Sequence, residues 1–191
     1  MIHMLYLAAG SSRHFVSEKL LSELNGKPVF LHGLERAAAI EARRAGCDLT
    51  VVARDAEILE AAQALGVRAV NSPQSCQGLS CTIRTGLTSL NFLAPEDFLM
   101  FIRADQPWLT EASIERVMDA ATPNCFAAVS CFEEQEGSPT LFSARLVTDL
   151  LRLKEDESGR RVLERYPGRA SRVELCSARE LCSVSQPAEP R

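Results

Sequence analysis

Apolar runs alternate with amphipathic stretches along this chain, and that alternation is the main indication of its fold. Short runs typical of buried strands occur at Met4–Ala8, Leu49–Ala53, Arg68–Asn71, Phe98–Arg103, Phe126–Phe132, Pro139–Ser143 and Arg172–Cys176. Between them, helical periodicity predicts helices at Pro28–Ala45, Ala56–Leu65, Leu79–Leu90, Glu111–Ala121, Ala144–Leu153 and Gly159–Arg165. Strands that alternate with helices predict an α/β fold with a parallel sheet.

Three residues mark expected helix ends. Pro28 suits the first turn of a helix, because its missing N–H would be unpaired there in any case. Gly46 stands where a helix would need a left-handed cap. Thr110 is placed to cap the helix that begins at Glu111.

Polar residues with candidate chemistry follow two of the expected strands. In an open α/β sheet, ligands bind beyond the carboxyl ends of the strands. The loop at residues 9–19 and the turn after Arg103 both lie at such ends, which places Gly10, Lys19 and Asp105 around one crevice. Glycine allows a backbone to approach phosphate oxygens closely, and a lysine adds a point charge for a di- or triphosphate.

Each of these residues also has an ordinary structural explanation. Lys19 followed by two leucines is typical of a surface lysine beside core residues. Asp105 before Gln-Pro is also a turn starter. Ser80 and Thr82 are residues that cap or turn a chain as readily as they bind a ligand.

Composition places the chain among ordinary globular proteins. It has 191 residues, 46% hydrophobic and 24% charged, which suffices for one domain, expected at residues 1–182, with a flexible tail at 183–191. A net charge of −4 without a basic run gives no support for nucleic-acid binding. The longest apolar runs are too short to cross a membrane, and no signal peptide is recognisable, so we expect a cytoplasmic location.

The chain has seven cysteines, at positions 47, 76, 81, 125, 131, 176 and 182. They form no C-x-x-C pair, and their total is odd. Zinc sites usually show closer ligand spacing. We therefore expect small, buried, reduced residues rather than a metal site.

Several segments together resemble those of the nucleotidyltransferases that join a nucleoside monophosphate to molybdopterin, the molybdenum cofactor cytidylyltransferases among them. The first is L-A-A-G-x-S at residues 7–12, with K-L-L at 19–21. The others are G-L-S-C-T-I-R-T-G-L at 78–87, A-D-Q-P-W-L-T at 104–110, G-S-P-T-L-F at 137–142 and S-G-R-R-V-L at 158–163. Their order and spacing extend over nearly the whole chain. Each alone is weak evidence, and the ordered set is strong.

This resemblance implies a fold, a reaction and a set of site residues. The fold is a three-layer α/β/α, Rossmann-like domain whose mostly parallel sheet has one late antiparallel strand. The reaction is Mg²⁺-dependent attack on the α-phosphorus of a nucleoside triphosphate, with release of pyrophosphate. The catalytic residues would be Lys19, Asp105 and Arg13, with Asp105 as the metal ligand. The residues that bind the substrates would be Ala8, Ala9, Gly10, Ser11, Ser12, Gly78, Ser80, Thr82, Gly137, Pro139 and Arg161.

The resemblance also suggests the substrates. Ala-Ala-Gly in the first turn is similar to the cytidylyl branch, and the methyl of Ala9 leaves less room for a purine, so CTP is expected. The pterin acceptor would lie near residues 137–142 and 157–161, where Arg160 and Arg161 would hold its phosphate. A molybdoenzyme or its chaperone would be the partner.

The sequence departs from the family pattern on the phosphate and metal side. His14 stands where an arginine is usual, Val16 and Ala104 replace glycines, and Ser183 lies where the family has an acidic motif. One interpretation is a working cytidylyltransferase with a variant loop. The other is a protein that binds nucleotide or pterin without efficient transfer. Transfer onto a sugar phosphate or methylerythritol phosphate is a third, which the Gly-Leu-Ser and Asp-Gln-Pro segments disfavour.

Overall fold

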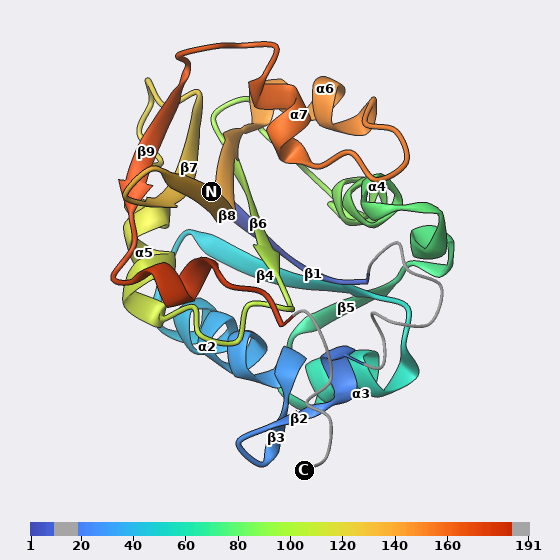
Figure 1. The fold of residues 1–191 in the computed structure, drawn as a ribbon. Helices are drawn as coiled ribbons and strands as arrows, with labels where there is room; N and C mark the ends of the chain where they lie inside the picture. The colour runs from blue at the N-terminus through green and yellow to red at the C-terminus, as the bar shows by residue number, and fades with distance from the viewer. Residues whose placement is uncertain (10–18, 185–191) are drawn as a thin grey trace.

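The computed structural model describes residues 1–9 and 19–184, and its central element is a seven-stranded sheet with the order β5–β4–β1–β6–β8–β7–β9 (Figure 1). Within this sheet β8 is antiparallel to both of its neighbours, and the remaining pairs are parallel. The expected mostly parallel sheet with one late antiparallel strand is therefore confirmed. The strands are β1 Ile2–Ala8, β4 Cys47–Ala53, β5 Arg68–Asn71, β6 Phe98–Arg103, β7 Ala127–Phe132, β8 Gln135–Ser143 and β9 Ala170–Glu174.

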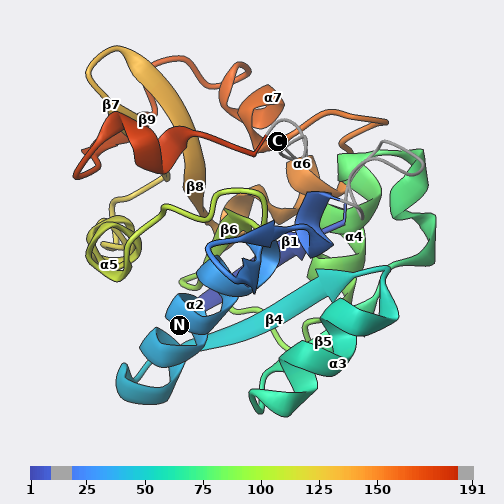
Figure 2. The same cartoon turned by 60° about the horizontal axis from the view of Figure 1, so that its bottom comes forward.

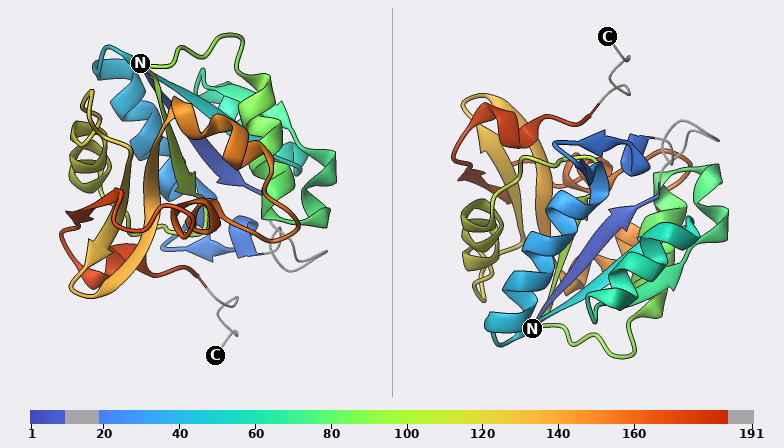
Figure 3. Two further views of the ribbon diagram at one scale, coloured as in Figure 1. Left: turned by 90° about the horizontal axis from the view of Figure 1, so that it is seen from above. Right: turned by 90° about the horizontal axis from the view of Figure 1, so that it is seen from below.

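Helices cover both faces of the sheet, as expected for three layers. One face carries α2 Val29–Arg43, α3 Ala56–Ala64 and α5 Glu111–Asp119, and Figure 2 shows α2 and α3 beside β4. The other carries α4 Leu79–Ser89, α6 Val147–Leu151 and α7 Gly159–Leu163; Figure 3 shows the two faces from opposite sides. Across the described residues, no helix has the length and apolar character needed to cross a bilayer.

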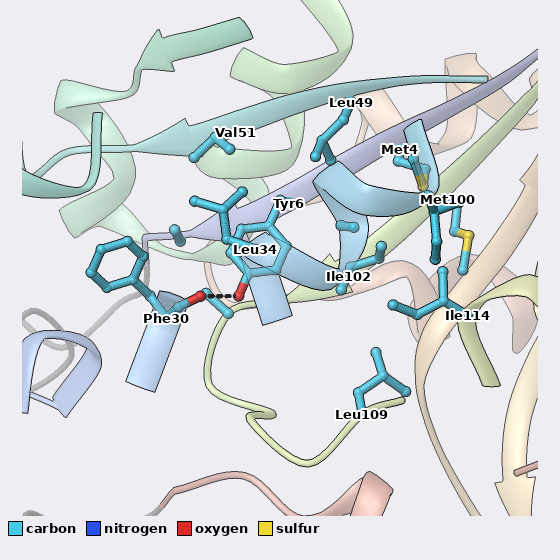
Figure 4. Packing of buried hydrophobic residues seen from close by; sticks show 14 of the residues in the cluster. Met4, Tyr6, Phe30, Leu34, Leu49, Val51, Met100, Ile102, Leu109 and Ile114 are labelled. Atoms are coloured by element: carbon cyan, nitrogen blue, oxygen red, sulfur yellow. Dashed lines mark hydrogen bonds between the residues drawn. The ribbon is translucent and has the colours of Figure 1, made fainter. Parts of the chain in front are cut away.

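Strand β1 divides the apolar core into two clusters because its side chains alternate between the two faces. Met4 and Tyr6 lie in the cluster beneath α2 and α5 (Figure 4), and Leu5 and Leu7 lie in the cluster beneath α4, α6 and α7. Every residue of β1 is buried. A continuous apolar run rather than an apolar–polar alternation is thus what a strand covered on both faces requires.

Tyr6 fixes the position of α2 on the sheet. Its hydroxyl donates a hydrogen bond of 2.6 Å to the carbonyl oxygen of Phe30, drawn as a dashed line in Figure 4. Gly33, one helical turn along, permits this contact, because a Cβ there would lie 2.7 Å from the tyrosine oxygen. Burial, the largest influence, raises the pKa of Tyr6, which therefore stays a neutral donor.

The boundaries differ from the sequence-based expectation in a few places. Pro28 ends β3 (Lys27–Pro28), which pairs with β2 (Glu23–Leu24), and α2 begins one residue later. The helix expected at Ala144–Leu153 is a short 3₁₀ turn, Ala144–Leu146, followed by α6. Gly46 has the expected positive φ of 80°, although α2 already ends at Arg43. Thr110 does cap α5, accepting a hydrogen bond of 3.2 Å from the Ser113 amide. Further 3₁₀ turns lie at Pro73–Gln77 (η1) and Ala178–Leu181 (η3).

The cysteines follow the expected burial only in part. Cys81 and Cys131 are buried, whereas Cys176 and Cys182 are exposed. The expectation is wrong for this second pair because both flank η3 near the surface of the molecule.

A buried histidine of β1 joins β4 and the residue before β6 at the amino-terminal edge of the sheet. The two ring nitrogens of His3 lie 2.8 Å from a carboxylate oxygen of Asp48 and 3.4 Å from one of Asp97. The hydrogen bond with Asp48 is the largest influence and raises the pKa of His3, although burial opposes it. The protonated imidazole is therefore favoured in the folded state.

We expect His3→Gln to remove a pH dependence of stability. A folded-state pKa above the usual value of about 6.5 means that the stabilisation is complete below about pH 6.5 and is lost as the pH rises through the folded-state pKa. Urea unfolding at pH 5.5 and 8.5 measures the difference. His32→Gln is the control, because a ring nitrogen of His32 lies 2.8 Å from the carbonyl oxygen of Leu24, a neutral partner. An unchanged pH dependence in His3→Gln would contradict this assignment.

Because Tyr6 contacts Gly33, we expect the stability losses caused by substitutions at these two positions to be non-additive. Tyr6→Phe should cost about 1 kcal/mol of unfolding free energy through the lost hydrogen bond. Gly33→Ala should cost about 1–3 kcal/mol, because the new methyl meets the tyrosine oxygen. In the Tyr6→Phe background the cost of Gly33→Ala should fall by about 1 kcal/mol. Chemical denaturation of the four proteins checks this, and additive costs would refute the proposed contact.

Candidate functional site

The carboxyl ends of β1 and β6 bring the first loop and Asp105 to the same edge of the sheet. The two strands are parallel neighbours, with Leu7 opposite Arg103. The Ala104 amide continues the pairing by donating a hydrogen bond of 3.1 Å to the carbonyl oxygen of Leu7. Ala9 follows the end of β1 directly, and Asp105 comes two residues after the end of β6.

Helix α4 contributes a hydroxyl to this edge. The Oγ1 atom of Thr82 donates a hydrogen bond of 3.4 Å to the carbonyl oxygen of Ala9. Thr82 is fully buried, and both Ala8 and Ala9 are buried as well. The start of the loop is thereby held to α4, and Thr82 acts on the loop backbone.

Asp105 is bound by a neighbouring cation. Arg103 donates two hydrogen bonds, from Nε to Oδ1 at 3.0 Å and from an Nη atom to Oδ2 at 2.6 Å. Such a two-pronged pair is strong and directional. The Asp105 side chain is 21% exposed and that of Arg103 is 49% exposed, so both remain accessible from solvent.

The turn that carries Asp105 is held from two sides. Arg36 of α2 donates hydrogen bonds of 2.6 and 2.8 Å to the carbonyl oxygens of Pro107 and Leu109. From the other side, the amide of Val184 donates to the carbonyl oxygen of Asp105 at 2.9 Å. Ser183, which stands where the family's acidic motif is expected, is thus next to a residue that contacts Asp105.

Buried Glu180 joins this turn to the C-terminal segment. Its carboxylate accepts hydrogen bonds from the amide and hydroxyl of Thr110, the hydroxyl of Ser113 and the amides of Cys176 and Ser177. Burial by itself would raise the pKa of Glu180, but these hydrogen bonds outweigh it, so that the pKa is lowered. Because protein groups donate all of these hydrogen bonds to the charged carboxylate, we assign Glu180 a structural role.

A pocket of about 560 Å³ opens on the α4 and α7 side, next to Arg103. Its lining is only moderately more apolar than polar and comes from β1, α4, β6, β7, β8, β9 and α7. The apolar residues include Leu7, Leu79, Ile83, Phe101, Phe142 and Leu163. Gly137 and Ser138 of β8 and Gly159 of α7 also line it. The segments 137–142 and 157–161, expected to hold the acceptor, therefore line one pocket.

The rim of this pocket is charged. Three arginines and two carboxylates line it, namely Arg103, Arg160, Arg172, Glu136 and Glu164. The guanidinium of Arg172 lies 3.3 Å from Glu136, and that of Arg160 lies 4.0 Å from it. Arg161, expected to hold a phosphate, is not among the lining residues and pairs with Glu157 and Glu164 at 3.4 and 2.8 Å.

The segment expected around the base and ribose is packed against a loop. Gly78 has a φ of 134°, and a Cβ there would lie 2.2 Å from the carbonyl oxygen of Glu155. The amide of Ser80 donates to the same oxygen at 3.0 Å, and an Arg84 Nη atom donates to the Ser80 hydroxyl at 3.2 Å. Gly78 and Ser80 are both buried, so they hold the start of α4 in place.

The two site residues expected on β8 lie beside the C-terminal segment and β7. A Cβ on Gly137 would lie 3.0 Å from the side chain of Leu181, which would have to shift to make room for it. Pro139 follows a cis peptide bond, and its carbonyl oxygen accepts a hydrogen bond of 2.6 Å from Ser130.

Part of the expected site lies outside the described residues. This holds for Gly10, Ser11, Ser12 and Arg13, and for the variant positions His14 and Val16. Lys19 lies in a helical stretch that ends at Leu21, and its carbonyl oxygen accepts a hydrogen bond of 2.8 Å from the hydroxyl of Ser22. The shared crevice of Lys19 and Asp105 stays a prediction.

Sequence reasoning missed Arg103 and Glu180. Arg103 was visible as a charge that ends an apolar strand two residues before Asp105. The S-x-x-E pattern of Ser177 and Glu180 is a capping-box signal, and that box is present in η3. The partners Thr110 and Ser113 come from a distant segment, which no local pattern indicates.

The carboxylate of Asp105 at this edge suits a divalent metal whose remaining ligands are waters and substrate phosphates. Mg²⁺ is usually held by one or two carboxylates, waters and substrate phosphates. Asp105 offers one such carboxylate, although Arg103 now contacts both of its oxygens. Within residues 1–9 and 19–184, no group of three or more His, Cys, Asp and Glu residues could form a metal cage by itself.

Comparison with known proteins shows which family the chain belongs to. Residues 4–171 match the model of the MobA-like NTP transferase domain. The chain belongs to this family. An 8-amino-3,8-dideoxy-manno-octulosonate cytidylyltransferase of Shewanella loihica is 33% identical over 109 residues, 57% of this chain and 42% of that protein. The match thus covers less than half of the relative's length.

Solved structures support the fold. A nucleotidyl transferase from Methanothermobacter thermautotroptrophicus superimposes with a TM-score of 0.75 at 22% identity, over 97% of this chain and 92% of that chain. The Rv0371c protein of Mycobacterium tuberculosis H37Rv in complex with manganese gives a TM-score of 0.67 at 26% identity, over 92% and 89% of the two chains. The three-layer fold is therefore shared with nucleotidyltransferases.

We expect Glu180→Gln to destabilise the protein by about 2 kcal/mol or more, because an amide group would then face hydrogen-bond donors. The lowered pKa means that the stabilisation by Glu180 is complete above the unfolded-state pKa of about 4.3 and is lost as the pH falls through the folded-state value. Denaturant unfolding between pH 3 and 7 measures both effects. Exposed Glu134→Gln, the control, should change stability by less than about 0.5 kcal/mol. Equal effects of the two substitutions would contradict the role of Glu180.

Proposed function

We propose that this chain is a Mg²⁺-dependent cytidylyltransferase that transfers CMP from CTP to molybdopterin. The main support is one juxtaposition. Ala9 and Asp105 lie just beyond adjacent strand ends, and Arg103, which binds Asp105, also lines the pocket. A nucleotide at the strand ends and an acceptor in the pocket would then meet at Asp105.

The reaction requires alignment and charge neutralisation more than covalent chemistry by the protein. A phosphate oxygen of the acceptor attacks the α-phosphorus of CTP, and the bond from that phosphorus to the bridging oxygen breaks, which releases pyrophosphate. Asp105 would hold the divalent cation, whose charge offsets that of the triphosphate. Lys19 and the backbone amides from Ala9 to Ser12 would bind the remaining phosphate oxygens.

The preference for CTP rests on Ala9. Ala9 as a whole is 8% exposed, and its carbonyl oxygen accepts a hydrogen bond from Thr82, so its methyl group is fixed in place. A fixed methyl narrows the space beside the base, which disfavours a purine more than a pyrimidine. The cytidylyltransferase from Shewanella loihica is consistent with this choice.

The pocket favours a flat acceptor with a negative group. Aromatic and aliphatic walls, including Phe101 and Phe142, suit a heterocyclic ring, and the arginines at the rim suit a phosphate. A sugar acid is the second candidate acceptor, because the curated relatives are named for octulosonate substrates. Ser138, Thr140 and Ser171 also line the pocket and would bind sugar hydroxyls, so the preference for a flat ring rests on Phe101 and Phe142.

A third possibility is binding without efficient transfer. Arg103 engages both oxygens of Asp105, and Ser183 offers no carboxylate where the family has an acidic motif. These features weaken the metal side and leave the acceptor pocket unchanged.

Turnover assays distinguish these functions. Full-length protein with Mg²⁺ and either CTP or GTP is offered molybdopterin or 3-deoxy-manno-octulosonate, and pyrophosphate release is measured. We expect release with CTP and molybdopterin, and less with GTP. Asp105→Asn should lower the rate about 100-fold or more, because the metal loses its carboxylate.

Asp119→Asn is the matched control for this test. Asp119 pairs with Arg44 at 2.7 Å at the end of α5, so its substitution should leave the rate unchanged. Release with the sugar acid alone would support the second candidate. No release with any pair, combined with CTP binding in calorimetry, would support binding alone.

A further inference from the structure

Arg103 contacts Asp105 and also lines the pocket. Its guanidinium donates to both carboxylate oxygens of Asp105, at 3.0 and 2.6 Å. The same side chain lines the 560 Å³ pocket on the α4 and α7 side. It is therefore the residue through which the proposed metal ligand and the proposed acceptor pocket are in contact.

The pair with Asp105 is one that a divalent cation can replace. Both side chains are partly exposed, at 49% for Arg103 and 21% for Asp105, and partly exposed ion pairs contribute little net stability. A divalent cation and a guanidinium at the same carboxylate repel each other, and both would contact the two oxygens of Asp105. Binding of the cation therefore weakens the pair of Asp105 with Arg103.

Because Arg103 already lines the pocket, a guanidinium displaced from Asp105 stays beside a group bound there. Arg160 and Arg172, the other two arginines of the rim, already share the carboxylate of Glu136. Arg103 instead pairs with Asp105, the carboxylate to which the cation would bind. A freed fork of N–H donors binds phosphate or sulfate oxygens well.

We propose that Arg103 couples metal binding to anion binding: a divalent cation takes Asp105, and Arg103 then holds an anionic group in the pocket. This inference deepens the proposed function, since it rests on a metal at Asp105 and a phosphorylated acceptor in the pocket. Because coupling between two sites is reciprocal, an anion in the pocket also strengthens metal binding. Arg103 thus acts as a positioning residue, through which binding of the metal and binding of the acceptor phosphate favour each other.

The test measures Mn²⁺ binding by electron paramagnetic resonance, independently of turnover. The full chain and Arg103→Gln are titrated with Mn²⁺ in chloride and then in sulfate of equal ionic strength. Sulfate serves as the probe because it resembles a phosphate group and binds Mn²⁺ weakly. In chloride, Arg103→Gln should bind Mn²⁺ about fivefold more tightly than the parent. Sulfate should tighten Mn²⁺ binding to the parent about fivefold and leave Arg103→Gln unaffected.

Two further variants separate this coupling from a general loss of positive charge or of folding. Arg44→Gln removes an arginine that pairs with Asp119 at 2.7 Å, and its Mn²⁺ binding should match the parent in both salts. Asp105→Asn should lose Mn²⁺ binding. It should also bind sulfate more tightly than the metal-free parent in calorimetry, because Arg103 is then released without a metal.

The outcomes distinguish this inference from the proposed function. Equal Mn²⁺ affinity in the parent and Arg103→Gln, or the same sulfate effect in both, overturns the coupling even if CMP transfer proceeds. Transfer by the parent in the pyrophosphate assay would then leave the proposed function standing. Conversely, the expected Mn²⁺ and sulfate pattern without transfer to any acceptor supports the coupling and overturns the proposed function.

Discussion

The pairing of β1 with β6 is the constraint on which the rest of the molecule depends. Both strands are buried on both faces, so their register is fixed by packing against helices on either side. That register sets Leu7 beside Arg103 and delivers Ala9 and Asp105 to one edge. A slip by one residue would exchange the two apolar clusters and turn Tyr6 away from Phe30. The position of the site and the stability of the core therefore have the same cause.

Elements with a strong local signal could be predicted from the sequence. Strands such as Met4–Ala8 and Phe98–Arg103 are continuous apolar runs, because both faces of the sheet are covered. The start of β8 was missed, since Gln135 to Ser138 are polar or small and gain their order by pairing with β7 and lining the pocket. The β2–β3 hairpin was also missed, because strands of two residues are too short to show an alternation of apolar and polar positions.

The candidate site could be predicted in part for the same reason. Asp105 and Ala9 were found because they follow apolar strands, and the pocket lies where segments 137–142 and 157–161 indicated. The different surroundings of Arg160 and Arg161 could not be read from the sequence, since they depend on where α7 ends and which carboxylates are near. Likewise, the two hydrogen bonds from Arg103 to Asp105 depend on side-chain geometry beyond the end of β6.

The anchoring of the Asp105 turn by Glu180 has a consequence for the order of assembly during synthesis. A nascent chain that has emerged only as far as β9 already contains every strand of the sheet. It still lacks the carboxylate that binds Thr110 and Ser113, and the amide of Val184 that contacts the Asp105 carbonyl oxygen. The ribosome must therefore release these late residues before the turn that carries Asp105 has all its supports. Completion of the proposed nucleotide edge thus waits for residues 180–184, which are synthesised after every strand of the sheet.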